Sequence, residues 1–250
     1  MSATTRLRIR YSKLGKIRFT SHRDVARIWE RSLRRAALPI AYTEGFAPRP
    51  KLSFGLALST GYESLGEYLD VALREEAALP DPDGVPARLA AGLPPGIEVQ
   101  AVVALPPGAA SLQQVVSSCT WHVDIEGAGP SAVADALAAA LAADRLPLTR
   151  ERKGRHVTDD VRPAIADARV LGPADPTRGP GARVEAELMA QPRALRPAEL
   201  VAAIGPAGAA WQVRLATRIH QWTQAGGARR EVIDLPSAAT PPPHARARAS

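Results

Sequence analysis

Residues 5–36 read TRLRIRYSKLGKIRFTSHRDVARIWERSLRRA and change hydrophobic period part-way along. Apolar and basic residues alternate over Thr5–Tyr11. That period of two predicts a β-strand with Leu7 and Ile9 facing inward and the arginines between them facing out. After a turn, residues 16–20 are expected to continue as extended chain. The stretch therefore begins as a strand with one apolar and one basic face.

The second part of this stretch predicts an amphipathic helix. Ser21 is a good N-cap, and Asp24 takes the place of the glutamate in a capping box. The helix should end near residues 37–38, because Pro39 follows. One arc of the helical wheel is mostly apolar and carries Val25, Ile28, Trp29, Ser32, Leu33 and Ala36. The opposite arc is basic and carries Arg23, Arg27, Arg31, Arg34 and Arg35. We expect the first arc to be buried and the second to expose a row of guanidinium groups. These groups either bind phosphates or form a solvated face with i,i+4 partners, such as Glu30 for Arg34.

The remaining pattern predicts an α+β protein with two similar halves. Residues 1–108 and 109–225 each suggest the order of a split βαβ, so we expect two ferredoxin-like halves with antiparallel sheets. Residues 226–250 are rich in Pro, Ala and Arg and are expected to form a mostly disordered tail. The predicted strands are 39–43, 51–58, 66–73, 97–105, 118–126, 146–152, 182–189 and 211–222. The predicted helices are 85–93, 131–142 and 196–204.

Composition excludes several kinds of chemistry. Cys119 is the single cysteine among 250 residues, so one chain can form neither an internal disulfide nor a cysteine-based zinc or iron–sulfur site. The five histidines show no metal-ligand spacing, and we expect no metal and no cofactor. No apolar run approaches the ~20 residues that span a bilayer, and the N-terminus lacks the apolar core of a signal peptide. A cytoplasmic protein without a membrane partner is expected.

The net charge of +7 is concentrated at one end of the chain. Residues 1–54 contain thirteen Lys and Arg against three Asp and Glu, a surplus of ten positive charges. Residues 55–250 then carry a net charge of −3. A local surplus of this size attracts polyanions. We therefore expect the first quarter of the chain to bind a phosphate-rich partner, most plausibly RNA.

Two loops add candidate contacts to the basic helix face. Lys13, Lys16 and Arg18 surround the first turn, where a cationic hairpin would clamp a backbone, unless they serve only solubility. Residues 44–50 (EGFAPRP) form a loop stiffened by two prolines. Its Phe46 either stacks on an unpaired base or folds back into the core. The neighbouring cations of this second loop are Arg49 and Lys51.

Ser21, His22 and Asp24 combine residue types found in hydrolytic sites. They lie on one helical turn and point in different directions, which is unfavourable for a triad, so no catalytic residue is assigned. His22 alone remains a weak candidate for a general acid or base in metal-independent RNA cleavage. The same helix start offers free N–H groups to an anion. A nearby group either forms a small acidic site or, as we favour, pairs with arginines of the helix. This group contains Glu44, Glu63, Ser64, Glu67 and Asp70.

The segments KIRFTSHRDVARIWERSLRRA (16–36) and GFAPRPKLSFG (45–55) resemble the bacterial radical-SAM-linked protein family. Similarity is dense from Arg8 to Val71, and TRIHQW (217–222) and DDVRP (159–163) resemble weaker blocks. That family is a domain of unknown function found beside or fused to radical-SAM enzymes, and in actinobacteria often encoded near ribonuclease E/G. The CxxxCxxC triplet of the enzymes is absent, so the resemblance implies the linked partner. A weaker similarity of element order links the chain to ferredoxin-like RAMP proteins that bind RNA.

Three functions follow as hypotheses. The first is an RNA-binding accessory, acting on tRNA or rRNA, to an RNA-modifying or RNA-processing system. The second is a protein-interaction module that delivers substrate to a radical-SAM enzyme. The third is a metal-independent endoribonuclease that uses His22. Partners implied by the resemblance are a radical-SAM enzyme or ribonuclease E/G.

Overall fold

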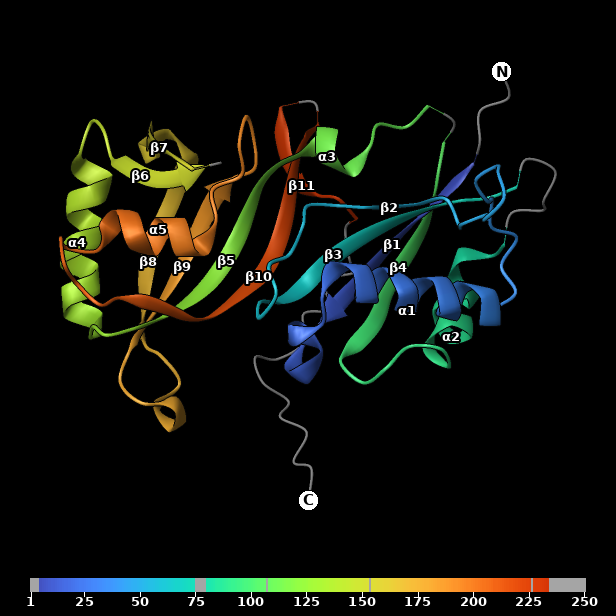
Figure 1. The fold of residues 1–250 in the computed structure, drawn as a ribbon, viewed down its shortest axis with the longest axis horizontal. Helices are drawn as coiled ribbons and strands as arrows, with labels where there is room; N and C mark the ends of the chain where they lie inside the picture. Colours follow the sequence, from blue (N-terminus) through green and yellow to red (C-terminus); the bar gives the residue numbers. More distant parts are fainter. Residues whose placement is uncertain (1–4, 75–79, 107, 153, 226, 234–250) are drawn as a thin grey trace.

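The computed structural model describes residues 5–74, 80–106, 108–152, 154–225 and 227–233 (Figure 1). They form a mixed α+β fold with one large sheet and few helices. The first half contains β1 (Arg6–Lys13), the 3₁₀-helix η1 (Gly15–Phe19), α1 (His22–Arg35), β2 (Leu52–Phe54), β3 (Glu63–Ala72), η2 (Pro82–Gly84), α2 (Val85–Ala90) and β4 (Ile97–Leu105). The second half contains α3 (Leu112–Val115), β5 (Val116–Glu126), α4 (Pro130–Ala142), β6 (Pro147–Arg152), β7 (Arg155–Asp160), η3 (Arg162–Ala164), β8 (Ile165–Pro173), η4 (Pro176–Arg178), β9 (Ala182–Met189), α5 (Pro197–Ile204), β10 (Gln212–Ala225) and β11 (Ala228–Glu231).

The two sheets expected from the sequence are joined into one. The strand order is β4-β1-β3-β10-β5-β9-β8, with β2 on β3 and β11 on β10. All pairings in this sheet are antiparallel except the junction between the halves, where β3 and β10 run parallel. Two register pairs, Thr217 with Glu63 and Arg218 with Ser64, define that junction. Strands β6 and β7 form a separate hairpin.

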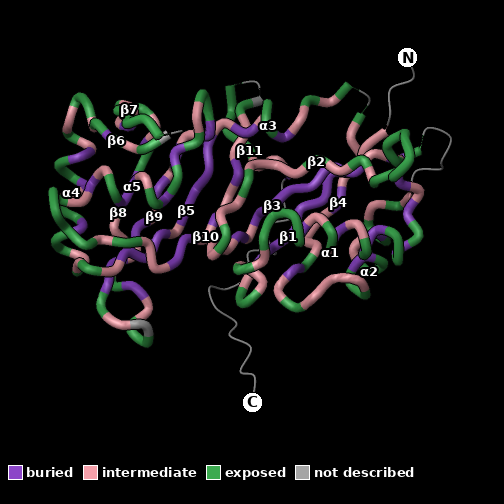
Figure 2. Tube along the Cα trace, in the orientation of Figure 1, coloured by how far each residue is buried: buried purple, intermediate pink, exposed green. Residues whose placement is uncertain are grey.

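Helices pack against the sheet, and most residues of its central strands are buried (Figures 1 and 2). Figure 1 shows α1 and α2 in front of the strands of the first half, and α4 and α5 beside those of the second. In Figure 2 the buried residues concentrate on the strands, and the exposed ones on loops and outer helix faces. The hydrophobic core is accordingly divided into one large cluster for each half and a small third cluster around Tyr68.

Helix α1 forms for the local reasons that the sequence indicates. The Ser21 hydroxyl accepts a hydrogen bond from the Asp24 amide at 3.2 Å and caps the first turn. Val25, Trp29 and Leu33 are buried against the sheet, as the apolar arc predicts. The Trp29 ring packs edge-on against Tyr11 of β1, with centroids 4.8 Å apart. These contacts fix which face of α1 meets solvent.

Several local expectations are wrong. Arg8 and Arg10 are buried, because the chain around Ala110 and Ile233 lies over the second face of β1, where its carbonyls accept hydrogen bonds from these arginines. Residues 16–20, expected to be extended, belong mostly to η1. Residues 39–43 form only isolated bridges at Ile40 and Tyr42.

The second half holds strands that the sequence pattern did not predict. β7 and β8 lie between the predicted strand 146–152 and helix 196–204. In β8 the alternation is irregular, with pairing register shifts on both sides of its centre. Strand β11 lies in the segment expected to be a tail, where it pairs with β10. Residues 234–250 of that expected tail lie outside the described residues.

Candidate functional site

The basic face of α1 is open to solvent. Its five arginines are all exposed, while Val25, Trp29 and Leu33 on the opposite face are buried. The arginines are Arg23, Arg27, Arg31, Arg34 and Arg35. We call this set the arginine face. It spans a helix of 14 residues, about 21 Å long.

Little negative charge neutralises the arginine face. The Arg27 guanidinium lies 3.1 Å from the Asp24 carboxylate, and both side chains are more than half exposed. For the other four arginines, no carboxylate lies within 4.0 Å in the described part of the chain. An exposed ion pair contributes little free energy, ~0–1 kcal/mol, so a polyanion can compete with Asp24. The face therefore presents a concentrated positive field.

The acidic residues expected to pair with this helix pair elsewhere. Asp70 binds Arg8 and Arg6 of β1, and Glu67 binds Arg218 of β10. Glu63 binds Arg18, which belongs to η1 and not to α1. That expectation is wrong because all three carboxylates lie on β3, next to the cations of neighbouring strands and turns. As a result, the arginine face keeps most of its charge.

The start of α1 uses its polar residues for capping. The Ser21 hydroxyl donates to one Asp24 carboxylate oxygen at 2.8 Å, and the Asp24 amide donates back to the hydroxyl. This hydrogen bond, and then Arg27, hold the pKa of the Asp24 carboxyl below its ordinary value. Asp24 and Ser21 are therefore hydrogen-bonded to each other. Within the described structure, no hydrogen bond joins His22 to either of them.

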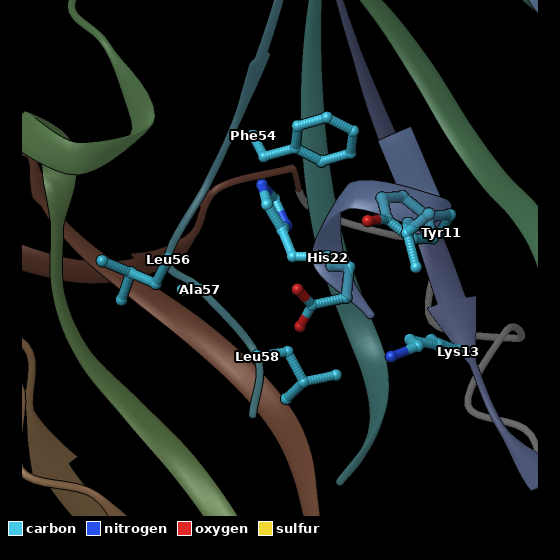
Figure 3. A pocket seen from close by; sticks show the side chains of 9 residues that line it. Tyr11, Lys13, His22, Phe54, Leu56, Ala57 and Leu58 are labelled. Carbon is cyan, nitrogen blue, oxygen red and sulfur yellow. The ribbon is translucent and has the colours of Figure 1, made fainter. Parts of the chain in front are cut away.

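A small pocket lies beside the start of α1 (Figure 3). The His22 ring packs edge-on against Phe54 of β2, with centroids 4.9 Å apart. The cavity volume is about 20 Å³, which suits one water molecule and is far too small for a nucleotide. Its lining residues come from β1, α1, β3 and the chain around β2: Tyr11, Lys13, His22, Val25, Phe54, Leu56, Ala57, Leu58 and Glu67.

Two ionisable groups that line this pocket, Lys13 and Glu67, are already engaged. Lys13 is only 4% exposed, and its ammonium donates to the carbonyls of Arg18 and Thr20 at 3.4 and 3.3 Å. Burial lowers the pKa of Lys13 and raises the pKa of Tyr11. Glu67 accepts from Arg218 at 2.8 Å. The expectation of an exposed hairpin is therefore wrong for Lys13, whose charge faces the protein interior.

The turn before α1 exposes an aromatic ring that the sequence reasoning missed. Phe19 is 62% exposed, and the guanidinium carbon of Arg18 lies 4.5 Å from its ring centroid. Arg18 is half-buried and bound to Glu63, and Lys16 is exposed. The sequence feature that could have indicated this exposed ring is an aromatic residue inside the basic segment KIRFT, directly before the helix cap.

The loop after α1 exposes its aromatic ring as well. Phe46 is fully exposed, so it does not plug the core. Arg49 and Lys51 beside it are also exposed. The backbone is held by a Thr43 amide bond to the Arg49 carbonyl at 2.8 Å, and Gly45 takes a left-handed φ of 118°. The conformation of the loop that carries Phe46 is therefore fixed by backbone interactions.

Across the described residues, no three His, Cys, Asp or Glu side chains lie together in a way that would hold a metal ion. Cys119 is buried in the second half, and burial raises the pKa of its thiol to about 11. None of the described helices has the length and apolar character needed to cross a lipid bilayer.

Comparison with protein families gives one match. Residues 6–197 match a family described as an uncharacterized protein conserved in bacteria (DUF2344). The chain belongs to this family. The part that matches the DUF2344 family contains the arginine face, the pocket and both exposed phenylalanines, and it ends at the first residue of α5. A search of curated proteins gave no match to this chain. The DUF2344 description names no activity.

Proposed function

We propose that this protein is an RNA-binding accessory that holds phosphate groups on the arginine face of α1. The observation that carries this proposal is the exposure of all five arginines of α1, with one carboxylate partner among the described residues. Guanidinium groups suit phosphates because they stay charged and donate paired hydrogen bonds. The His22 pocket has room for about one water, so a bound nucleotide would lie on the open surface and outside this pocket.

The architecture supports a relationship to ferredoxin-like RNA-binding proteins. In the first half, β4, β1, β3 and β2 lie side by side in that order, with α1 after the first strand and α2 before the last. In the second half, β10, β5, β9 and β8 repeat this arrangement, with the β6–β7 hairpin inserted after α4. We propose that each half is a ferredoxin-like unit and that the two arose as a tandem pair.

The partners are proposed from the resemblance stated above. A tRNA or rRNA would be the polyanion, and a radical-SAM enzyme or ribonuclease E/G would act on it in the cytoplasm. Under this proposal the protein contributes positioning of the RNA by its phosphates, and the enzyme contributes the chemistry.

A salt titration tests the proposal. The affinity for a fluorescent single-stranded RNA is measured between about 50 and about 200 mM KCl, for the wild type and for an Arg31/Arg34/Arg35→Gln variant. Three lost phosphate contacts should reduce the slope of log K against log salt by about 2, at ~0.7 per contact. A matched control removes the same charge from exposed arginines of the second half, Arg145/Arg155/Arg169→Gln. The control should bind like the wild type.

The outcomes separate the three functions. Absence of binding at low salt, or equal slopes for the α1 variant and the control, would refute the RNA-binding proposal. A stable complex with a radical-SAM enzyme from which nucleic acid is absent would favour the protein-interaction function instead. Cleavage of the RNA in EDTA that disappears in His22→Ala would favour the endoribonuclease.

A further inference from the structure

Exposed aromatic rings lie in the segments before and after the arginine face. The large hydrophobic side chains that are exposed in the described ranges are Phe19, Tyr42, Phe46 and Leu171. Three of these four are aromatic, and all three belong to the segments that directly precede or follow α1. In a fold that buries Leu and Val throughout two cores, a group of exposed aromatics next to cations indicates a binding surface.

Phe19 is held in an exposed position by its surroundings. The Arg18 side chain covers one side of the ring and is itself fixed by Glu63 at 3.1 Å. The Glu63 carboxylate also accepts the Gly15 amide at 3.0 Å, and the Arg18 carbonyl accepts the Gly61 amide at 2.8 Å. The turn that carries the Phe19 ring is therefore held by hydrogen bonds. A flat ligand can stack on the ring without a large loss of conformational entropy in the protein.

The two phenylalanines flank the arginine face along the chain. Phe19 closes η1, three residues before α1 begins, and Phe46 lies in the loop beyond the end of α1. In Figure 1, η1 lies at one end of α1 and the loop lies beyond the other end. Between them runs a helix of about 21 Å with exposed guanidinium groups. Along the chain, the phosphate contacts thus lie between two stacking positions, and we call Phe19, the arginine face and Phe46 together the path.

We infer that this path binds an unpaired RNA strand, with bases stacked on Phe19 and Phe46 and with the phosphates between them on the arginine face. This inference rests on the proposed function and adds the substrate class. A duplex keeps its bases stacked inside the helix and has no free base face to offer these rings. A single strand offers both its bases and its phosphates.

Two comparisons test the inference with the full-length chain. The first compares wild-type affinity for an RNA strand of about 12 nucleotides, the same strand annealed to its complement, and a ribose-phosphate strand of equal length without bases. The intact single strand should bind most tightly. The second compares Phe19→Ala and Phe46→Ala with Leu171→Ala, a truncation of an exposed apolar residue in the second half.

Each phenylalanine variant should bind the single strand about 5-fold to about 150-fold more weakly, the range expected for one lost base stack. Leu171→Ala should leave the affinity unchanged. All three side chains are exposed, so circular dichroism should show an unchanged fold. Equal affinity for the single strand and the base-free strand, or single-strand binding that is insensitive to both phenylalanines, overturns this inference. If the Arg31/Arg34/Arg35→Gln variant still loses binding in that case, the proposed function stands without it. If no RNA binds at all, both fail.

Discussion

Arg8 of β1 and Asp70 of β3 form a buried, two-pronged ion pair across the central strands. Arg8 Nε donates to Asp70 Oδ1 at 2.7 Å, and Arg8 Nη2 donates to Oδ2 at 2.8 Å. Both side chains are almost inaccessible. Arg6 approaches the same carboxylate at 3.5 Å. Arg8 is therefore neutralised inside the first half and Arg6 shares the same carboxylate, which separates the role of these two arginines from that of the arginine face.

Replacing Asp70 with Asn should destabilise the protein strongly. The variant leaves the Arg8 guanidinium buried without a counter-charge, a loss of about 3–5 kcal/mol in the free energy of unfolding. Urea denaturation followed by circular dichroism measures this. The matched control is Glu185→Gln on β9, whose partners Arg169 and His122 both reach solvent, and it should cost less than about 1 kcal/mol. Equal effects of the two changes would contradict the prediction.

A second buried pair connects the halves, because Arg218 of β10 binds Glu67 of β3 at 2.8 Å. The Arg218 guanidinium also lies 4.7 Å from the Trp121 ring centroid. Arg218→Met should cost about 3–5 kcal/mol, since Glu67 is left charged and buried. The double variant Arg218→Met/Glu67→Leu should recover much of this loss, because neither charge remains. A double variant no more stable than the single one would show that the pair's charges are not the cause.

Any side chain at Gly96 should destabilise the fold. A Cβ at this position would lie 2.3 Å from the Leu14 carbonyl oxygen, and its φ of 94° is unfavourable for other residues. Gly96→Ala should lower the free energy of unfolding by about 2–6 kcal/mol, the sum of backbone strain and overpacking. Gly208→Ala is the control, because its φ of 79° is similar but nothing lies within 4 Å. It should cost only about 1–2 kcal/mol in thermal or urea unfolding. If Gly208→Ala cost as much as Gly96→Ala, the contact with Leu14 would be unimportant.

The Cys119 thiol should be inert in the folded protein. Burial raises its pKa to about 11, so it is almost entirely protonated near pH 8, and the reactive thiolate is scarce. A chromogenic thiol reagent at pH 8 should label the native protein very slowly and label it fully in guanidinium chloride. Because the unfolded chain has an ordinary thiol, it is the internal control. Rapid labelling of the native state would show that this core opens easily.

Local features of the sequence were sufficient to predict α1. Its cap residue, its apolar arc and its basic arc all lie within sixteen residues, so neighbouring residues alone specify the helix and its faces. The bounds of β4 and β9 follow equally from local patterns. Strands β7, β8 and β11 were not predicted, since their short or irregular patterns gain their stability from pairing with other strands.

By itself, the sequence determined that a basic, amphipathic helix follows the first strand and that the surplus of positive charge is concentrated in residues 1–54. Only the tertiary structure decided which cations remain available. Arg8 forms an ion pair with Asp70, 62 residues away in the sequence, and Arg218 forms one with Glu67, 151 residues away. The order of the strands in the sheet determines which of these charged residues become neighbours, and local sequence patterns do not encode that order. The exposure of Phe19 and Phe46 depends in the same way on how the chain packs around them, because an aromatic residue in a loop suits either the core or a ligand.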